Sequence, residues 1–574
     1  MATAVLMPKL GLTMTEGTIE RWAVREGDPV RKGDVLYTVS TDKLTNEIEA
    51  EEDGVLLKIL CPEGGTAPCK EAVAYIGQPG EKLLQEDRSA AAAASPSAAS
   101  AAPASEAHSK TVLVIGGGPG GYVAAIRAAQ LGASVTVVEQ ERLGGTCLNV
   151  GCIPTKCLLH SAGLLSEIRE RSAAMGIQVS GVTLDFPQVI AHKDEVSGRL
   201  TSGIAALLRI NRISLVEGEA SFLSPRSVQV RKKDGSLQTL AADAVIVATG
   251  SVNATPPIPG LTDNKNCLDS TAALSLEKMP ESMVVIGGGV VGMELACAYS
   301  AFGTRITVIE ALDHMLPMLD EEITAVGVAH LKKRGVEFHL SCPVQRVEPS
   351  PVGAKVICRN AAGEEIAFEA EKVLVAIGRR ANTASLHLEA AGIQHDRGRI
   401  RVNDRMETNV PGIYAIGDCV FGKAMLAHTA SVMGEVAAEN SMGQQSVYDQ
   451  KTCPSCVYME PEAASVGLTE AQCREKGIDY IVGKFPMSAN GKALILNGGE
   501  GLVKILADRR YHEVLGLHII GPRAADLIGE GALALRLEAT LEELISTIHS
   551  HPTVTETVRE AALHAEKRAI HIKN

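Results

Sequence analysis

An apolar strand pattern runs directly into a glycine-rich turn at Thr111-Val112-Leu113-Val114-Ile115-Gly116-Gly117-Gly118-Pro119-Gly120-Gly121. An alanine-rich helix pattern follows to Leu131, and a second strand pattern at 135–138 ends on Glu139, 23 residues after Gly116. Glycine clusters alone are common in turns. A strand, a G-x-G-x-x-G turn, a helix and an acid about twenty residues on together predict a dinucleotide-binding fold.

The same pattern occurs a second time. The strand pattern 283–286 leads into Gly287-Gly288-Gly289-Val290-Val291-Gly292, and the strand pattern 305–309 ends before Glu310, again 23 residues after the first glycine. The repetition predicts two dinucleotide-binding domains in series, because such glycines let backbone N–H groups approach a pyrophosphate at a helix N-terminus. The expected contacts are Gly116, Gly118 and Gly121 for one dinucleotide and Gly287, Gly289 and Gly292 for the other.

Two cysteines follow the first unit, in Gly144-Gly145-Thr146-Cys147-Leu148-Asn149-Val150-Gly151-Cys152-Ile153-Pro154-Thr155-Lys156. On an ideal helix their Cα atoms would lie farther apart than the ~4.4 to 6.8 Å that a disulfide needs, so the chain must deviate between them. Gly151 supplies the freedom. Pro154 suits the first turn of a helix, which places Cys152 near a helix N-terminus that favours a thiolate. The alternative is a pair of buried small hydrophobic residues.

The cysteine stretch has the form G-G-T-C-x-x-x-x-G-C-x-P-[ST]-K and resembles the active-site stretch of the pyridine nucleotide-disulfide oxidoreductases. The resemblance implies a redox-active disulfide between Cys147 and Cys152, with FAD in the first nucleotide site. Its remaining implied FAD contacts are Glu139, Thr146, Lys156, Ala220, Thr249, Gly250, Asp418, Met425, Leu426, Ala427 and His428. For Asp418 the alternative is a turn aspartate after Gly417.

Glu310 indicates which nucleotide the second site takes. A carboxylate at this position hydrogen-bonds a free ribose 2′-hydroxyl and repels a 2′-phosphate, so NAD is favoured over NADP. The resemblance adds Glu294, which would pair with Lys156 beside the flavin, and further contacts at Val344 and Gly378. Glu294 and Lys156 could otherwise be helix-surface charges.

Residues 1–80 alternate short apolar strand patterns with Gly-, Asp- and Pro-containing turns, which predicts an all-β module. Lys43 lies between the strand patterns 35–39 and 45–49, so we expect it at an exposed hairpin tip. The module resembles a lipoyl domain, a flattened β-barrel or sandwich, and the resemblance implies lipoate on Lys43. A biotin-carrying domain would flank its lysine with methionines, which are missing here. Without the resemblance, Lys43 would be a solvated charge.

Composition and motifs divide the chain into six segments. An Ala-, Ser- and Pro-rich tract, 81–109, cannot bury enough apolar surface to fold and is predicted to be a linker. The segments expected around it are a lipoyl domain (1–80), an FAD-binding domain with the disulfide (110–260), an NAD-binding domain (261–380), a central domain completing the FAD site (381–452) and a dimerisation domain (453–574). The expected fold is therefore multidomain: an all-β domain, an α/β body with two Rossmann-like domains, and a C-terminal α+β domain.

The last segment contains His549-Ser550-His551-Pro552-Thr553-Val554-Thr555-Glu556, which matches the H-x-H-P-T-x-x-E run of the same family. The match implies that His551 exchanges a proton with a substrate thiol and that Glu556 orients it. A structural His–carboxylate pair is the alternative. Cys453 and Cys456 form a C-x-x-C, which could indicate a zinc site or a second redox pair. No second pair of ligands with suitable spacing accompanies it, so structural packing is the preferred interpretation.

Taken together, these resemblances imply a homodimeric flavoenzyme that reoxidises protein-bound dihydrolipoamide with NAD. Its partners would be the acyltransferase and decarboxylase components of a 2-oxo acid or related dehydrogenase complex. The alternatives are another disulfide reductase of the family, of the glutathione or mercuric reductase type, or a non-enzymatic lipoyl carrier. Glu310 speaks against the glutathione type, and the tail His571-Ile572-Lys573-Asn574 lacks the cysteine pair usual in the mercuric type.

The composition indicates which kinds of partner and which cellular compartment to expect. A net charge of −13 with no compensating basic block argues against nucleic acid. No long apolar stretch suggests a membrane span, and the N-terminus lacks a basic region followed by an apolar one. Thirteen cysteines, an odd number, fit a reducing compartment in which a disulfide is catalytic, so a cytoplasmic location is expected.

Overall fold

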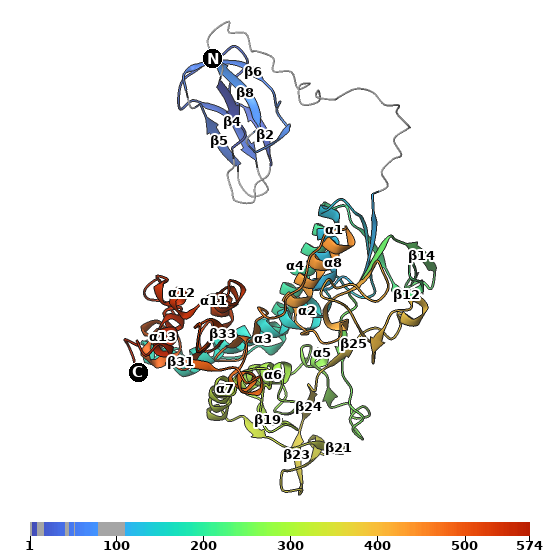
Figure 1. Ribbon diagram of the computed structural model, residues 1–574, viewed down its shortest axis with the longest axis vertical. Coiled ribbons are helices and arrows are strands. Elements are labelled where there is room, and N and C mark those ends of the chain that lie inside the picture. The colour runs from blue at the N-terminus through green and yellow to red at the C-terminus, as the bar shows by residue number, and fades with distance from the viewer. Residues whose placement is uncertain (1–2, 9–15, 41–44, 51, 70, 78–108) are drawn as a thin grey trace. The chain divides into compact units, whose positions relative to one another are not determined.

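The computed structural model describes residues 3–8, 16–40, 45–50, 52–69, 71–77 and 109–574. The chain divides into two compact units, Met1–Glu106 and Ala107–Asn574, which are described separately (Figure 1). Lys43 lies outside the described residues, as does 81–108 of the predicted linker.

The first unit is built from two antiparallel sheets around one small core. One sheet has the order β1 (Thr3–Leu6), β8 (Ala72–Gly77), β6 (Gly54–Ile59), β3 (Pro29–Val30), and the other β5 (Thr45–Glu49), β4 (Val35–Ser40), β2 (Glu16–Trp22), β7 (Thr66–Pro68). Alternating apolar residues such as Ile19, Leu36 and Leu56 are buried between the strands. The predicted all-β module is confirmed.

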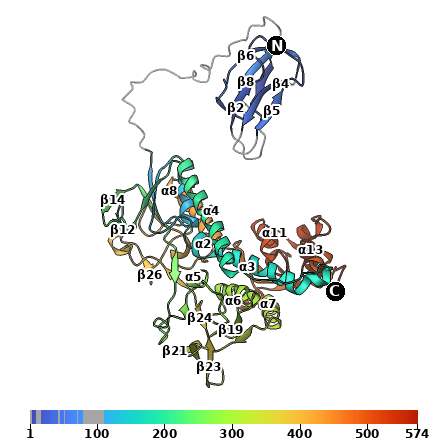
Figure 2. The same ribbon diagram turned by 180° about the vertical axis from the view of Figure 1, so that it is seen from behind.

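The second unit begins with a five-stranded parallel sheet. Its order is β11 (Ser214–Glu217), β10 (Ser134–Glu139), β9 (Thr111–Ile115), β15 (Ala244–Val247), β28 (Ile413–Ala415). Helices α1 (Pro119–Gln130) and α8 (Ala427–Ser441) lie against each other beside this sheet (Figure 1), and Figure 2 shows α8 from behind. The two helices can approach closely because Gly434 has no side chain. A Cβ at this position would lie 2.5 Å from the Gly120 carbonyl oxygen. Strand β28 and helix α8 therefore bring the segment 381–452 into the first nucleotide-binding domain.

A second parallel sheet repeats this design. Its order is β17 (Cys267–Leu268), β24 (Lys372–Val375), β18 (Ser282–Ile286), β19 (Arg305–Ile309), β20 (Glu337–His339), and α6 (Val290–Phe302) follows β18. Two short antiparallel strands, β16 (Ser251–Asn253) and β25 (Arg379–Ala381), pair where the chain enters and leaves this domain. Strands β9 and β19 have the bounds predicted from the sequence, and β10 and β18 begin one residue earlier than predicted.

The C-terminal part is an α+β domain, as predicted. Its antiparallel sheet has the order β29 (Ser455–Val457), β30 (Ala463–Gly467), β33 (Val514–Ile520), β32 (Leu502–Asp508), β31 (Tyr480–Pro486). Helix α11 (Ala524–Arg536) packs on β30 and β33, and α13 (Glu556–Ala565) packs on β31 and β32.

A buried lysine joins this domain to the second nucleotide-binding domain. Lys504 on β32 is 1% exposed, and its Nζ lies 3.0 Å from Asp320, 2.7 Å from Glu322 and 2.6 Å from Glu470. Asp320 caps the N-terminus of α7 (Glu321–Lys333). Burial alone would raise the pKa of Asp320, but the Lys504 ammonium outweighs it and lowers that pKa.

We expect Lys504→Met to lower the melting temperature by several degrees, because it leaves carboxylates without their cation, a change that costs about 3–5 kcal/mol at buried sites. Arg474→Met is the control, since Arg474 pairs with Glu470 at 3.0 Å but is largely exposed and should contribute less than about 1 kcal/mol. Thermal unfolding of both variants tests this, and equal shifts would contradict it.

The Asp320 carboxylate also makes stability depend on pH. Because the pKa of Asp320 is lowered on folding, its contribution to stability is present above the usual pKa of ~3.9 and is lost as the pH falls through the lowered value.

Candidate active site

One large cavity contains most of the residues predicted to bind cofactors. Its volume is about 1710 Å³, above the ~300–1,000 Å³ of a site for one small molecule. Both glycine turns line it, so it is continuous from the first nucleotide-binding domain to the second. The predicted residues that line it are Gly116, Gly118, Glu139, Thr146, Cys147, Cys152, Lys156, Ala220, Thr249, Gly250, Gly287, Gly289, Glu294, Glu310, Val344, Gly378, Asp418, Met425, Leu426, Ala427 and His428.

The glycines of each turn have two different tasks. A Cβ at Gly121 would lie 1.8 Å from the Gly116 carbonyl oxygen, and one at Gly292 would lie 2.1 Å from that of Gly287. These third glycines do not line the cavity and instead allow the helix to pack closely on its strand. At the middle position of the second turn, Gly289, a Cβ would meet nothing within 4 Å, so the backbone is open to a ligand there. Both turns fit the pyrophosphate of a dinucleotide.

In both nucleotide-binding domains, the same hydrogen bonds hold the glutamate that comes at the end of the strand following the glycine turn and its helix. Glu139 Oε2 accepts a hydrogen bond from Gly117 N at 2.6 Å, and Glu310 Oε2 accepts one from Gly288 N at 2.6 Å. The other oxygen accepts a backbone N–H two residues on, at 2.8 Å in each case. Each carboxylate is therefore fixed beside its glycine turn, where it fits a ribose hydroxyl.

The two cysteines lie on either side of a break between helices. Helix α2 (Gly145–Val150) carries Cys147, and α3 begins at Cys152 (Cys152–Ser166). Gly151 separates them with φ −140° and ψ −114°, and a Cβ there would lie 2.8 Å from the Thr146 carbonyl oxygen. The predicted deviation of the chain and the predicted helix start are confirmed.

The two thiols are close neighbours with unequal acidity. The Cys147 thiol, the partial positive charge of the helix start and Lys156 lower the pKa of Cys152 to about 7. The Cys152 thiol and burial raise the pKa of Cys147. Cys152 is therefore the more acidic thiol of the pair.

A glutamate of the second nucleotide-binding domain, Glu294, positions Lys156. Its Nζ lies 2.8 and 3.0 Å from the two carboxylate oxygens of Glu294, which is 3% exposed on α6. Glu294 also accepts the backbone N–H of Tyr458 at 2.9 Å, and the Lys156 ammonium lies 4.5 Å from the centre of the Tyr458 ring. A cation is thus fixed one helical turn after Cys152.

Arg379 is a cavity residue to which sequence reasoning gave no role. Its guanidinium donates to Ser251 Oγ at 2.6 Å, Asn253 Oδ1 at 2.7 Å and the Ser251 carbonyl at 2.7 Å. Ser251 in turn donates to Asp418 at 2.5 Å, so the aspartate is part of a network. Arg379 is the first residue of β25, where the chain passes out of the second domain. The sequence feature that could have indicated its role is a charged residue that follows the apolar strand β24.

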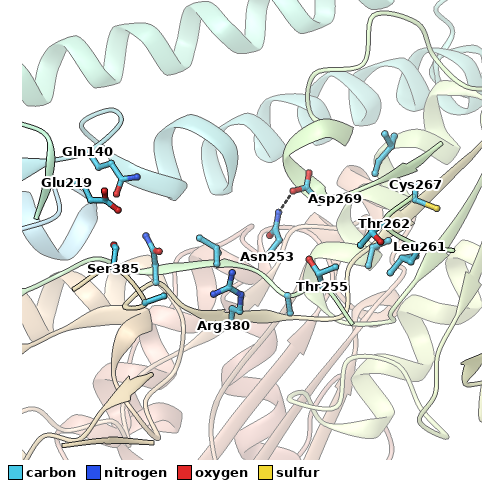
Figure 3. A pocket seen from close by; sticks show the side chains of 16 residues that line it. Gln140, Glu219, Asn253, Thr255, Leu261, Thr262, Cys267, Asp269, Arg380 and Ser385 are labelled. Carbon is cyan, nitrogen blue, oxygen red and sulfur yellow. Dashed lines mark hydrogen bonds between the residues drawn. The ribbon is translucent and has the colours of Figure 1, made fainter. Parts of the chain in front are cut away.

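A smaller cavity of about 540 Å³ adjoins the large one. The residues that line both are Gln140, Val252, Asn253, Asp269, Val375, Asn382 and Ser385. Figure 3 shows Asn253 directed at Asp269, to which it donates a hydrogen bond of 2.9 Å. Arg380 also lines this space. The smaller cavity lies along β16 and β25, so it belongs to the passage between the two nucleotide-binding domains.

His551 and Glu556 do not line the large cavity. His551 Nδ1 lies 3.0 Å from Glu556 Oε1, and the other carboxylate oxygen accepts the Thr553 backbone N–H at 2.9 Å. Burial alone would raise the pKa of Glu556, but these two bonds outweigh it and lower that pKa. The His551 side chain is 81% exposed, so within its own chain the ring faces outward. The side chain of His549 is instead only 5% exposed and lies 2.8 Å from Glu530 on α11.

Residues 110–434 match the family model described as "Pyridine nucleotide-disulphide oxidoreductase", and residues 453–562 match its dimerisation domain. The chain belongs to the pyridine nucleotide-disulphide oxidoreductase family. Residues 3–76 match the model for biotin- and lipoyl-carrying domains, described as "Biotin-requiring enzyme". The predicted family membership is therefore confirmed.

Several characterised members of the family are similar to this chain over nearly their whole length. Dihydrolipoyl dehydrogenase of Bacillus subtilis is 45% identical over 80% of this chain and 97% of its own, and mitochondrial dihydrolipoyl dehydrogenase 1 of Arabidopsis thaliana is 43% identical over 80% and 91%. Among solved structures, LpdA of Mycobacterium tuberculosis has a TM-score of 0.73 at 28% identity, covering 79% of this chain and 99% of its own. None of the helices in the described part of the chain is long and apolar enough to cross a membrane.

Proposed function

We propose that this protein is an NAD-linked dihydrolipoyl dehydrogenase that carries its own lipoyl domain. The observation that carries the proposal is the thiol pair of Cys147 and Cys152 in the wall of a cavity shared by two dinucleotide-binding turns. Similar proteins named dihydrolipoyl dehydrogenase and the lipoyl-type domain at residues 3–76 favour dihydrolipoamide as the dithiol substrate.

The residues of the cavity fit FAD in the first domain and NAD in the second. When bound, FAD supplies the two-electron chemistry that links the thiol pair to NAD. Gly116, Gly118 and Glu139 would hold the FAD, with Asp418 and Thr249 further along it. Gly287, Gly289, Glu310, Val344 and Gly378 would hold the NAD.

His551 starts the reaction as a base. Its Nδ1–H is donated to Glu556, which leaves Nε2 free to take a proton from a substrate thiol. The substrate sulfur attacks Cys147 of the oxidised pair, and Cys152 leaves as a thiolate, for which its lowered pKa suits it. The second substrate thiol then attacks the mixed disulfide, so the substrate gains a disulfide bond and the enzyme pair becomes a dithiol.

The active unit is a homodimer in this proposal. His551 is exposed within its own chain and belongs to the part that matches the dimerisation model, so it can serve the cysteine pair of a second copy. Lys43 would carry the lipoate, and acyltransferase and decarboxylase components of a 2-oxo acid or related dehydrogenase complex would be the partners. The cytoplasmic location remains a prediction.

The direct test of this function is NADH formation by the purified protein from dihydrolipoamide and NAD. We expect rapid turnover of dihydrolipoamide with NAD. We expect no turnover of glutathione disulfide with NADPH. Turnover of the second pair of substrates without the first would replace the proposal with a glutathione-type reductase.

Glu310→Arg should relax the preference for NAD. The change exchanges repulsion of a 2′-phosphate for attraction, so the ratio of kcat/KM for NAD to that for NADP should fall on the order of a hundredfold. Glu337→Arg is the control, because it reverses the same charge on the next strand, β20, outside the cavity. Equal ratios in the two variants would mean that the nucleotide is read elsewhere.

Lys43→Ala tests the role of the fused domain. A tether gives an effective concentration on the order of millimolar, so lipoate on Lys43 should be reduced by NADH without added lipoamide. The variant should lose this reaction and keep the turnover of free dihydrolipoamide. Intact mass before and after treatment measures both the attachment and the reduction, and loss of both reactions would contradict a carrier role.

A further inference from the structure

Cys453 lies beside the first turn of α8. Thr429 Oγ1 lies 3.0 Å from Cys453 Sγ, and His428 is a close polar neighbour of the same sulfur. His428 is held in turn by the Pro454 carbonyl oxygen, 2.9 Å from its Nε2. We call Cys453, His428, Thr429 and Tyr448 the Cys453 cluster.

Tyr448 indicates that the cluster is built for a charged sulfur. It is 6% exposed, and its hydroxyl faces Cys453 and Thr429 but has no hydrogen-bond partner of normal geometry. Buried hydroxyls are nearly always satisfied, because leaving one unpaired is costly. A thiolate at Cys453 would be a stronger acceptor for this hydroxyl than a neutral thiol.

The charges around Cys453 agree with this interpretation. Burial alone would raise the pKa of Cys453, but His428 and Thr429 outweigh it and lower that pKa. The contact with Cys453 also raises the pKa of His428, so the two groups favour an imidazolium–thiolate pair. The other titratable groups that act on the cluster are Cys456, Cys152 and Asp449, and the Lys423 ammonium lies 5.2 Å from the centre of the Tyr448 ring.

The neighbouring cysteine has the opposite character. Burial raises the pKa of Cys456 to about 11, so only the first sulfur of the C-x-x-C is poised to react. Among the residues that the structure describes, no three His, Cys, Asp or Glu side chains are grouped as metal ligands, which leaves zinc without enough donors here. The packing role favoured by the sequence pattern does not account for the polar partners of Cys453.

We propose that Cys453 is a nucleophilic thiol-exchange site, separate from the Cys147–Cys152 pair, that takes small disulfides. The Cys453 thiolate attacks one sulfur of the disulfide, a new S–S bond forms as the old one breaks, and the other half leaves as a thiolate that takes up a proton. The disulfide is the only oxidant needed. His428 and Thr429 stabilise the attacking charge.

The oxidised holoenzyme allows this site to be tested alone, because Cys147 and Cys152 are then joined and cannot be alkylated. Iodoacetamide labelling at stepped pH, followed by peptide mass spectrometry, gives the rate at each cysteine. Cys453 should label fastest, ahead of the half-buried Cys157, Cys267 and Cys456, whose pKa values burial raises. Its midpoint should lie below the ~8.5 of a free cysteine; a midpoint at or above that value would overturn the proposal.

Two variants separate the cluster from a merely accessible cysteine. Thr429→Val removes the hydroxyl with little change of shape and should slow the labelling of Cys453 at pH 7 about tenfold. Ser431→Ala is the control, since it removes a hydroxyl on the same helix that donates only to the Ala427 carbonyl, and it should label at the wild-type rate. Glutathione disulfide should add one glutathione at Cys453, which excess thiol removes, and Cys453→Ser should gain none. Addition at another cysteine instead would contradict the site.

Discussion

Replacing either Cys147 or Cys152 with serine is expected to reduce dihydrolipoamide turnover by about 10⁴-fold or more, the scale seen when a covalent nucleophile is removed. In the proposed mechanism, the first variant lacks the sulfur that the substrate attacks, and the second lacks the leaving thiolate at the start of α3. Both should retain FAD, because the glycine turn and Asp418 lie on other elements of the cavity. Turnover with dihydrolipoamide and the flavin absorbance of the purified variants measure the two effects.

Cys157→Ser is the matched control. Cys157 is a half-buried cysteine on the same helix, one residue after Lys156, and it does not line the cavity. It should keep the wild-type turnover. If all three variants lose activity together, or if both active-site variants lose FAD, the effect comes from the folding of α3 and not from a redox pair.

His551→Ala is expected to lower turnover by about 10²- to 10⁴-fold, the usual contribution of a positioned acid–base group. His571→Ala is its control, since it also removes an exposed histidine that lies 3.0 Å from a glutamate in the same domain. The loss should be in the step that uses dihydrolipoamide, measured by stopped-flow reduction of the enzyme. Equal losses in the two variants would indicate a structural role for the His551–Glu556 pair.

Local patterns were sufficient to predict the two nucleotide-binding domains. Each glycine turn is a short-range feature, because the strand, the turn, the helix and the acid are adjacent in the chain and share one hydrogen-bond scheme, as Glu139 and Glu310 show. The break at Gly151 and the helix start at Cys152 were predictable for the same reason. The strand bounds follow because buried parallel strands are continuous apolar runs.

Contacts between distant segments could not be predicted in this way. Lys504 occupies an apolar strand pattern, and its partners Asp320 and Glu470 lie 184 and 34 residues away. Arg379 and Ser251 meet only when β16 pairs with β25. The C-x-x-C pattern likewise suggested a relation between Cys453 and Cys456, whereas the partners of Cys453 come from the start of α8. The motif at 549–556 located His551, but its outward orientation is a property of the folded domain.

In the proposed dimer, each active site combines the cysteine pair of one subunit with His551 of the other. A twofold dimer contains two equivalent sites of this kind. Mixing Cys147→Ser and His551→Ala chains under subunit exchange makes heterodimers in which one site carries both changes and the other carries neither. Random exchange makes half of the dimers heterodimers with one intact site of two, so activity should return to about a quarter of wild type. If native mass spectrometry shows the heterodimers and the mixture stays as inactive as its parents, the shared site is contradicted.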